Sequence, residues 1–511
     1  MGIESAMVSA SAFCRVFRHR GRHVVYDVPT NRLLAVDPVL AAVLPLYGPL
    51  RRAELNDRLG SQFSHTVIDA AVAEIEDGRR REGLFRTDRP RSMPPVWTAA
   101  DDHALACCRR QLILAVSEDC NLRCSYCPLG AKLATRRPRR PLRMPREIAL
   151  AAVDDFLAAS AETEAPIISF YGGEPLLALD LLLDLVTEVR RRPGGERVRF
   201  CLDTNGLGLS DPRAADMIRR ERMFVQVSID GPAGLHDRHR RTARGGPSHA
   251  RIEANLAGLL RADPTLAGRL SVIATLTSPR DLMAAGEYFA DFPPFRAAGI
   301  DRPVCLRVNR VRHLERAAAA DRNVHCGAEQ SQADDAAQWR RQLSALRERY
   351  LAWRAGETYD TWHPFLQALF EDSLIAWYHR DGNPQSTAVH LGGCCLPGVR
   401  RLYVGSDGTL AACERIGGQW PLGTVAAGID VRRIQALRER FARAVGDRCR
   451  NCWAVRLCNV CYTCLEPESG ALPAEVCEGV RRGLTATLRL LLDLKSRHSR
   501  SLQWLVETSV T

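Results

Sequence analysis

The chain has 511 residues, of which 46% are hydrophobic, and its formal net charge at pH 7 is +12. This length predicts two to four domains with enough apolar side chains for a large core. Nearly all of the positive charge is arginine, because lysine occurs only at Lys132 and Lys495. The basic run at 136–146 has no aromatic residues on which bases could stack, so it favours a solvated loop over nucleic-acid binding, although basic surface can also attract an acidic peptide.

The eighteen cysteines suggest specific ligation in a reducing compartment. A secreted disulfide protein would need an export signal, and the first residues show no basic segment followed by an apolar run. The apolar stretch at 176–186 is interrupted by Asp180 and Asp184 and is shorter than the ~20 residues of a membrane span. We therefore expect a cytoplasmic protein that has no membrane partner.

Residues 1–95 read as a separate small domain. The segment 22–36 predicts two strands around a Pro-Thr-Asn turn. Three helical stretches follow at 37–48, 52–63 and 64–85, the last with apolar residues at three- and four-residue spacing. A hairpin followed by three helices is winged-helix-like, and residues 87–96 are typical of a linker.

Residues 100–330 alternate between apolar strands and helical stretches. Such alternation predicts an α/β fold with a parallel sheet or partial barrel, whose ligands bind at the carboxyl ends of the strands. The expected strands are 112–116, 167–171, 198–203, 223–229, 270–276 and 304–308.

The remaining chain divides into three parts. Residues 331–388 predict a helical connector, and residues 481–511 an amphipathic carboxyl-terminal helix. Residues 389–480 are rich in cysteine and show little regular periodicity, so we expect bound metal to organise this part.

Three cysteines, Cys120, Cys124 and Cys127, follow the first strand of the alternating region within eight residues. Three thiolates can hold a four-iron cluster and leave one iron open for a substrate. The alternative is zinc, for which Cys107 or Cys108 could supply a fourth ligand.

At these positions the sequence resembles the radical S-adenosylmethionine (SAM) enzymes. Cys120, Cys124 and Cys127, with Tyr126 before the last of them, match the cysteine loop of that family. The stretch FYGGEPLL follows the second strand, where the family has a GGE motif that meets the SAM amino group; its residues here are Gly172, Gly173 and Glu174. The resemblance implies a [4Fe-4S] cluster and SAM as cofactors and a partial (β/α)6 barrel.

Weaker matches follow later strands. Arg240 stands where the family has an arginine that meets the SAM carboxylate, and a guanidinium is a suitable partner for that group. Asn205, Ser228 and Asp230 follow the third and fourth strands and could also contact SAM. A loop salt bridge or a polar turn is the alternative explanation for each of them.

The second cysteine block resembles the SPASM extension of radical SAM enzymes. Cys395-x12-Gly408-x4-Cys413 and Cys449-x2-Cys452-x5-Cys458 fit its pattern, but Cys461 and Cys464 depart from the expected spacing, and Cys394 competes with Cys395. The resemblance implies two auxiliary [4Fe-4S] clusters. One would be bound by Cys449, Cys452, Cys458 and Cys477, and the other by Cys395, Cys413 and either Cys461 or Cys464.

The resemblance leaves one alternative open and does not assign the other cysteines or Glu414 to a cluster. A structural zinc ribbon is the alternative for the second block. Cys14, Cys201, Cys305 and Cys326 fit no pattern. Glu414 directly follows Cys413 and occupies a position where related enzymes can carry a proton acceptor that faces the substrate.

The first domain then resembles the winged-helix peptide-recognition domain of enzymes that modify ribosomally made peptides. Such a domain takes the leader of a precursor peptide as an added strand. The expected surface here is the strand at 22–28 with the helix at 65–80.

The resemblance implies an enzyme that cleaves SAM to a 5′-deoxyadenosyl radical, which takes a hydrogen from the peptide. An electron donor such as flavodoxin or ferredoxin is expected. The bond formed would be a thioether or another cross-link; epimerisation and side-chain oxidation in the manner of sulfatase maturases remain open. A zinc- or nucleic-acid-binding regulator is the alternative from a different class, and the GGE stretch and the βα alternation argue against it.

Overall fold

A computed structural model describes residues 11–90, 97–127, 140–310, 327–380, 382–383, 394–466, 468–497 and 502–508. Cys326 and parts of the expected linker and of the basic run at 136–146 lie outside these ranges, as does the expected boundary at 388/389. None of the described helices is long and apolar enough to cross a membrane.

The amino-terminal unit is a three-stranded antiparallel sheet followed by three helices. Its strands are β1 (Cys14–His19), β2 (Arg22–Asp27) and β3 (Arg32–Val36), in the order β1-β2-β3. The helices are α1 (Pro38–Val43), α2 (Arg52–Leu59) and α3 (His65–Glu82). Asp37 caps α1 by accepting from Leu40 N at 2.7 Å. The sequence predicted β2 and β3 but not β1. Because β1 pairs with β2 on the side away from β3, β2 is the middle strand of the sheet.

Both faces of this small sheet are covered. Val25 packs with the helices, where Ile68 and Ile75 of α3 are fully buried. Val24 and Tyr26 face the other way and belong to the core of the main body. This alternation follows from the two-residue period of a strand, and it fastens the amino-terminal unit to the rest of the molecule.

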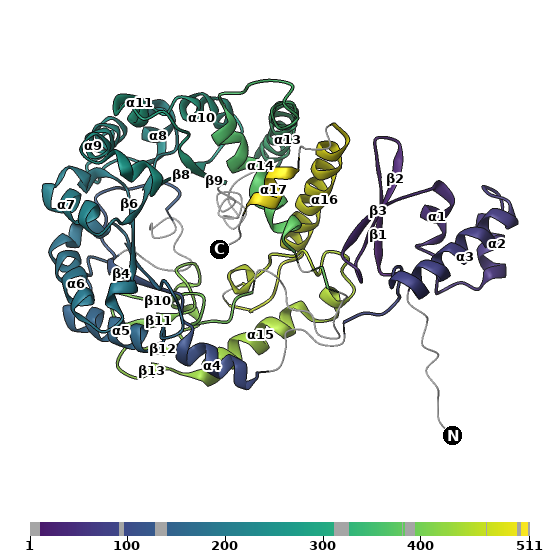
Figure 1. Cartoon of the computed structure of the whole chain (residues 1–511), viewed down its shortest axis with the longest axis horizontal. Coiled ribbons are helices and arrows are strands. Elements are labelled where there is room, and N and C mark those ends of the chain that lie inside the picture. The colour runs from purple at the N-terminus through teal and green to yellow at the C-terminus, as the bar shows by residue number, and fades with distance from the viewer. Residues whose placement is uncertain are drawn as a thin grey trace.

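The main body begins with α4 (Ala99–Cys107) and six parallel strands, which confirm the α/β class and all six expected strands. They run in the order of the chain and form a curved sheet (Figure 1). The strands are β4 (Gln111–Ser117), β5 (Ile167–Gly172), β6 (Arg199–Thr204), β7 (Phe224–Ser228), β8 (Leu270–Leu276) and β9 (Cys305–Arg310).

Helices cover the outer side of this sheet (Figure 1). α6 shows why: Leu182, Leu185 and Val189 recur at three- and four-residue spacing, and all three are fully buried. The helices are α5 (Arg146–Ala158), α6 (Leu179–Arg191), α7 (Pro212–Arg220), α8 (Ala233–His239), α9 (His249–Ala262), α10 (Asp281–Ala290) and α11 (Pro293–Ala297). Short 3₁₀ helices occur at Pro175–Ala178, Gly195–Arg197, Leu207–Ser210 and Pro264–Gly268.

The carboxyl-terminal third adds helices and extends the sheet. Its first helices are α13 (Gly327–Arg354) and α14 (His363–Tyr378), so helices do occur in the segment 331–388. β10 (Leu402–Val404) pairs in parallel with β4, and an antiparallel run of β11 (Thr409–Ala411), β12 (Gly423–Thr424) and β13 (Gly428–Ile429) continues from it.

The cysteine-rich region is therefore more regular than its sequence indicated. α15 (Val431–Arg450) lies inside it, flanked by 3₁₀ turns at Gly417–Gln419 and Tyr462–Cys464. Its side chains Ile434, Leu437 and Phe441 join the main core. The expectation that metal organises this part stays a prediction, but core packing contributes as well, because a sheet extension and an amphipathic helix anchor this part. α16 (Ala474–Arg497) begins before residue 481, and α17 (Gln503–Glu507) follows it.

Candidate functional site

The three predicted cysteines lie in the loop after β4, at the carboxyl ends of the parallel strands. A second segment, after α8, holds this loop in place through backbone hydrogen bonds. Ser125 N donates to His239 O at 3.0 Å, and Arg123 N donates to Arg241 O at 2.7 Å. Because these bonds join residues more than a hundred positions apart, the loop conformation depends on the folded barrel.

Tyr126 and Arg240 meet beside Cys124, as the resemblance predicts for residues around one ligand. Tyr126 donates to Asp230 Oδ2 at 2.6 Å, and Arg240 Nη1 donates to the Tyr126 oxygen at 2.9 Å. Burial raises the pKa of Asp230, and Arg240 opposes this shift. Burial also raises the pKa of the Cys124 thiol to about 11, again against the effect of Arg240. The Cys124 thiol is therefore neutral near pH 7 in the absence of a bound cation.

The glycines of the GGE stretch allow β5 to approach the cysteine loop closely. Gly172 has φ +129°, and a Cβ added there would lie 2.1 Å from Ser117 O. A Cβ on Gly173 would lie 2.2 Å from Asp119 O. Gly173 N donates to Ser117 O at 2.7 Å, so the approach is bonded as well as close.

Glu174 is buried, and its carboxylate is directed toward the end of β6. It accepts hydrogen bonds from Thr204 Oγ1 and Asn205 N, both at 2.7 Å, and from Leu176 N at 3.1 Å. The side chain of Glu174 thus holds two loops together. Its backbone N donates to Asp119 O at 2.9 Å.

Asn205 links the end of β6 to the cysteine loop. Its Nδ2 donates to Asn121 Oδ1 at 2.7 Å and to Cys120 Sγ at 3.7 Å. Ser228 ends β7 at the same edge of the sheet. His239 was not predicted as a site residue, yet it bonds Ser125 Oγ at 2.7 Å and Thr277 Oγ1 at 2.9 Å.

These residues fit a cluster and SAM. Three partly exposed thiols lie in one loop, and the buried Nε of Arg240 has no hydrogen-bond partner among the described residues. That orphaned N–H is a donor for a carboxylate. The zinc alternative that used Cys107 or Cys108 was wrong, because these residues precede β4, and a seven-residue strand of about 20 Å separates them from the loop.

The later cysteines form two electrostatic groups. Burial, followed by Cys458, Cys477 and Cys452, raises the pKa of Cys449 to about 12. Burial likewise raises the pKa of Cys458 to about 11, with Cys452 and Cys477 adding to the shift. These mutual effects on the pKa values indicate that the four cysteines lie near one another, and they are the four that the resemblance assigned to one cluster.

The second group contains Cys395, Cys413 and Cys461. Burial and then Cys461 raise the pKa of Cys395, and the shift of Cys413 to about 11 includes an effect of Cys395 after those of burial and Glu414. Cys464 hydrogen-bonds to Cys461 and so lowers the Cys461 pKa to about 6. Cys394 is buried, and its Sγ contacts Val460 O at 3.7 Å.

Glu414 belongs to a polar cluster on the inner side of the sheet. It accepts from Arg401 Nη1 at 2.9 Å. Burial raises the pKa of Asp203 on β6 to about 7, with Glu414 adding to the shift and Arg307 and Arg401 opposing it. Asp203 and Arg307 were not predicted as site residues. Their signal is the two-residue alternation of their strands, in which the neighbouring Leu202 and Leu306 face the helices.

Comparison with known proteins defines the class. Residues 114–263 match the model of the radical SAM superfamily, and the chain therefore contains a radical SAM domain. Proteins of this superfamily use a [4Fe-4S] cluster and SAM.

Particular relatives are more distant. The chain is 26% identical over 142 residues to the serine-type anaerobic sulfatase-maturating enzyme of Bacteroides thetaiotaomicron, which is 28% of this chain and 34% of that protein. It is 33% identical over 203 residues to the GTP 3′,8-cyclase of Synechococcus elongatus, which is 39% of this chain and 54% of that protein. The matches thus span about a third to a half of these curated relatives.

The fold is similar over a greater length. The structure of anSMEcpe with bound AdoMet superposes with a TM-score of 0.53 at 18% identity, covering 78% of this chain and 98% of that chain. At this identity the likeness concerns the fold, and it includes parts of the chain beyond the matched radical SAM domain.

Proposed function

We propose that this radical SAM enzyme acts on a ribosomally made peptide and takes a hydrogen atom from one of its residues. The observation that carries the proposal is the place of Glu414. This residue directly follows Cys413 of the second cysteine block, yet it interacts with Asp203 of β6 inside the curved sheet. The two cysteine regions therefore border one polar interior, in which a substrate can contact both.

Cys120, Cys124 and Cys127 would hold the first cluster. Bound together, the cluster and SAM supply a 5′-deoxyadenosyl radical. Arg240 offers its buried Nε–H to the SAM carboxylate, while its Nη1 stays on Tyr126. Close packing of the glycine stretch against the cysteine loop excludes water behind the site.

The second cysteine block would hold two further clusters, one on Cys395, Cys413 and Cys461. Glu414 and Asp203 would accept a proton from the substrate as it is oxidised. Arg401 donates to Glu414 and opposes the raised pKa of Asp203, so it favours the ionised form that acts as a base.

The peptide as substrate is supported by the relatives rather than by the barrel alone. The two relatives named above differ in chemistry, so a radical SAM domain does not define a substrate. Solved structures of anSMEcpe include complexes with AdoMet and the peptides Cp18Cys and Kp18Cys. The similar fold favours a substrate of the same class, with a thioether or another cross-link as the product.

Side-chain oxidation is the second candidate, because sulfatase-maturating enzymes recur among the relatives. The two reactions leave different products. An oxidised serine or cysteine carries an aldehyde that a hydrazide traps, whereas a cross-linked residue does not. Hydrazide labelling of the treated peptide, followed by mass spectrometry, therefore separates them.

The expected amino-terminal docking of the leader needs a correction. Segment 22–28 contains β2, which hydrogen-bonds to β1 on one side and to β3 on the other. A strand whose backbone is paired on both sides cannot take a further strand. Only the edges at β1 and β3 remain for strand addition within this sheet.

The test measures SAM cleavage and iron in the same preparations. Anaerobically reconstituted protein should hold about twelve irons in three clusters and, once reduced, produce 5′-deoxyadenosine. Cys124→Ala should abolish this product, whereas Cys452→Ala should lose about four irons and keep SAM cleavage. Cys201→Ala, a buried thiol on β6, is the matched control and should change neither. Zinc in place of iron in the wild-type protein would reject the proposal.

A further inference from the structure

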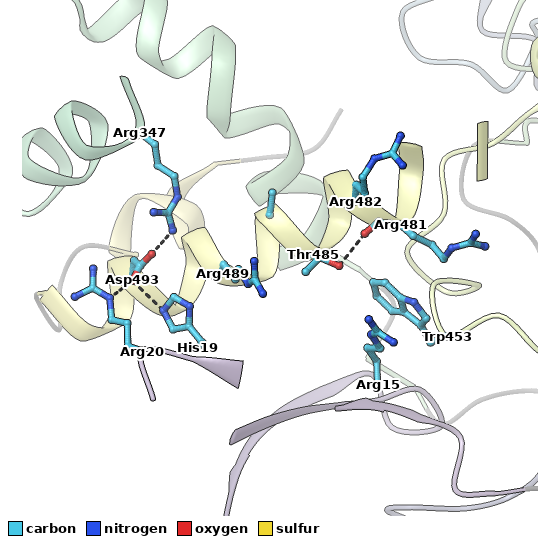
Figure 2. A pocket seen from close by; sticks show the side chains of 11 residues that line it. Arg15, His19, Arg20, Arg347, Trp453, Arg481, Arg482, Thr485, Arg489 and Asp493 are labelled. Atoms are coloured by element: carbon cyan, nitrogen blue, oxygen red, sulfur yellow. Dashed lines mark hydrogen bonds and ion pairs between the residues drawn. The ribbon is translucent and has the colours of Figure 1, made fainter. Parts of the chain in front are cut away.

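A basic pocket of about 860 Å³ lies between the amino-terminal sheet and α16, outside the radical SAM site. β1 contributes Arg15 and His19 to one wall, with Arg20 just beyond the strand. Figure 2 shows the opposite wall, formed by one face of α16. That face carries Arg481, Arg482, Thr485, Ala486, Arg489 and Asp493, and the pocket is completed by Arg347 and Trp453.

The charges in this pocket are unbalanced. Asp493 is the only acidic residue among the described residues that line it, and its carboxylate is already bonded to His19 at 2.9 Å, to Arg20 at 2.5 Å and to Arg347. These cations hold the pKa of Asp493 below its usual range although burial opposes them. At this end of the pocket one carboxylate therefore partly offsets the cations.

At the other end of the pocket, no carboxylate among the described lining residues offsets the guanidinium groups. Arg481 and Arg489 form no ion pair with a carboxylate in the described part of the chain, and Arg482 reaches only Glu478, at 3.5 Å. Arg15 lies over the ring of Trp453, 6.0 Å from its centroid. Several guanidinium groups thus share a concave surface without counter-charges, an arrangement that attracts an anion.

The length of the arginine row indicates the shape of that anion. From Arg481 to Arg489, α16 rises by about 12 Å at 1.5 Å per residue. A single phosphate or carboxylate cannot span this row. An extended peptide of about four residues can, at roughly 3.3 Å per residue, and every second side chain would face the helix.

We propose that this pocket binds an extended acidic segment of the peptide substrate, with aspartate or glutamate side chains on Arg481, Arg489 and Arg15. The proposal rests on the proposed function for the identity of the peptide. Trp453 directly follows Cys452, and Arg481 lies four residues beyond Cys477 on α16, so the pocket borders the cysteine-rich region. A segment held there would enter the molecule beside the auxiliary cysteines.

A peptide fits better than a nucleic acid. Trp453 is the one Phe, Tyr or Trp among the described lining residues, and it already lies edge-on to Tyr26 and beneath Arg15; the other ring, of His19, is bonded to Asp493. Single-stranded nucleic acids bind where several rings stack on successive bases. Carboxylates need only the guanidinium donors that the pocket supplies.

The experiment measures fluorescence anisotropy of a labelled peptide with the full-length reconstituted protein at moderate salt. The probe alternates glutamate and alanine over about eight residues, and its control has glutamine in place of glutamate. The glutamate peptide should bind and the glutamine peptide should not. Arg489→Glu should weaken binding about tenfold, because it replaces an attraction with a repulsion.

A second variant and a matched control complete the test. Arg15→Glu, on the opposite wall, should weaken binding as much as Arg489→Glu. Lys495→Glu makes a charge reversal on an exposed residue of the same helix but outside the pocket, and it should leave affinity unchanged within about twofold. Equal weakening by Lys495→Glu, or no effect of the two arginine variants, would overturn the proposal.

Two further readouts separate the alternatives. An oligodeoxythymidine that binds more tightly than the glutamate peptide, and loses its affinity in Arg489→Glu, would assign the pocket to nucleic acid and overturn the proposal. 5′-Deoxyadenosine is measured separately: its formation without peptide binding rejects the pocket assignment alone. Peptide binding without its formation rejects the proposed enzyme and keeps the binding site.

Discussion

Arg240 donates a hydrogen bond to the phenol oxygen of Tyr126 over 2.9 Å, and this bond joins the cysteine loop to the segment after α8. Tyr126 in turn donates to Asp230, so one hydroxyl group connects a buried cation to a buried carboxylate. Removal of that hydroxyl group would leave both partners without the bond that satisfies them.

Tyr126→Phe should therefore destabilise the loop. We expect the free energy of unfolding to fall by about 1–3 kcal/mol, the cost of leaving buried polar groups unsatisfied. SAM binding, measured by equilibrium dialysis on reconstituted protein, should weaken as well because Arg240 loses its support. Tyr359→Phe changes a tyrosine that is 88% exposed and should alter neither quantity. An unchanged melting temperature and SAM affinity for Tyr126→Phe would refute this role.

Gly173→Ala should displace the cysteine loop. The added methyl group would lie 2.2 Å from Asp119 O, and backbone atoms must move to admit it. We expect the reconstituted variant to lose about four irons, those of the first cluster. Gly234→Ala is the matched control: it lies in α8, and its Cβ would meet no heavy atom within 4 Å. A normal iron content in Gly173→Ala would contradict this account of the glycine stretch.

The sequence predicted the barrel well because buried parallel strands are short apolar runs separated by amphipathic helices. It missed β1, since the segment CRVFRH places arginines and a histidine among its apolar residues and resembles a loop. Of these basic side chains, Arg15 and His19 line the pocket at α16. It also missed α15, whose arginines mask the spacing of Ile434, Leu437 and Phe441.

The interior site could be predicted only in part. Loop motifs such as GGE are local, so a short stretch of sequence shows them. Asp203 and Arg307 approach each other only because β6 and β9 curve within one sheet, and no local sequence pattern predicts this proximity. The position of β2 as the middle strand was missed for the same reason, because it depends on pairing with β1.

The choice between Cys461 and Cys464 can now be tested. Cys461 influences the pKa of Cys395 directly, whereas Cys464 reaches the group through its hydrogen bond to Cys461. Cys461→Ala should therefore lose about four of the roughly twelve irons, and Cys464→Ala should keep them. Iron and sulfide analysis of both variants after reconstitution decides the matter; the reverse pattern would make Cys464 the ligand.

Asp203 makes stability depend on pH in a direction opposite to that of most carboxylates. Burial raises its pKa from 3.8 to about 7, with Glu414 and, more weakly, Glu174 adding to the shift and Arg307 and Arg401 opposing it. A folded-state pKa above the unfolded one means that the folded protein binds this proton more tightly. The stability that Asp203 contributes is therefore complete below about pH 4 and is lost as the pH rises through about 7.

Asp203→Asn removes this titration, since the amide stays neutral. The difference in melting temperature between Asp203→Asn and the wild-type protein should become more positive as the pH is raised from about 4 to 8. Asp180→Asn, an 89% exposed carboxylate on α6, is the control and should show a difference that does not change with pH in this way. If the Asp203→Asn difference stays flat or declines over this range, the pKa of Asp203 is not raised in the folded protein, and this account of its buried environment is wrong.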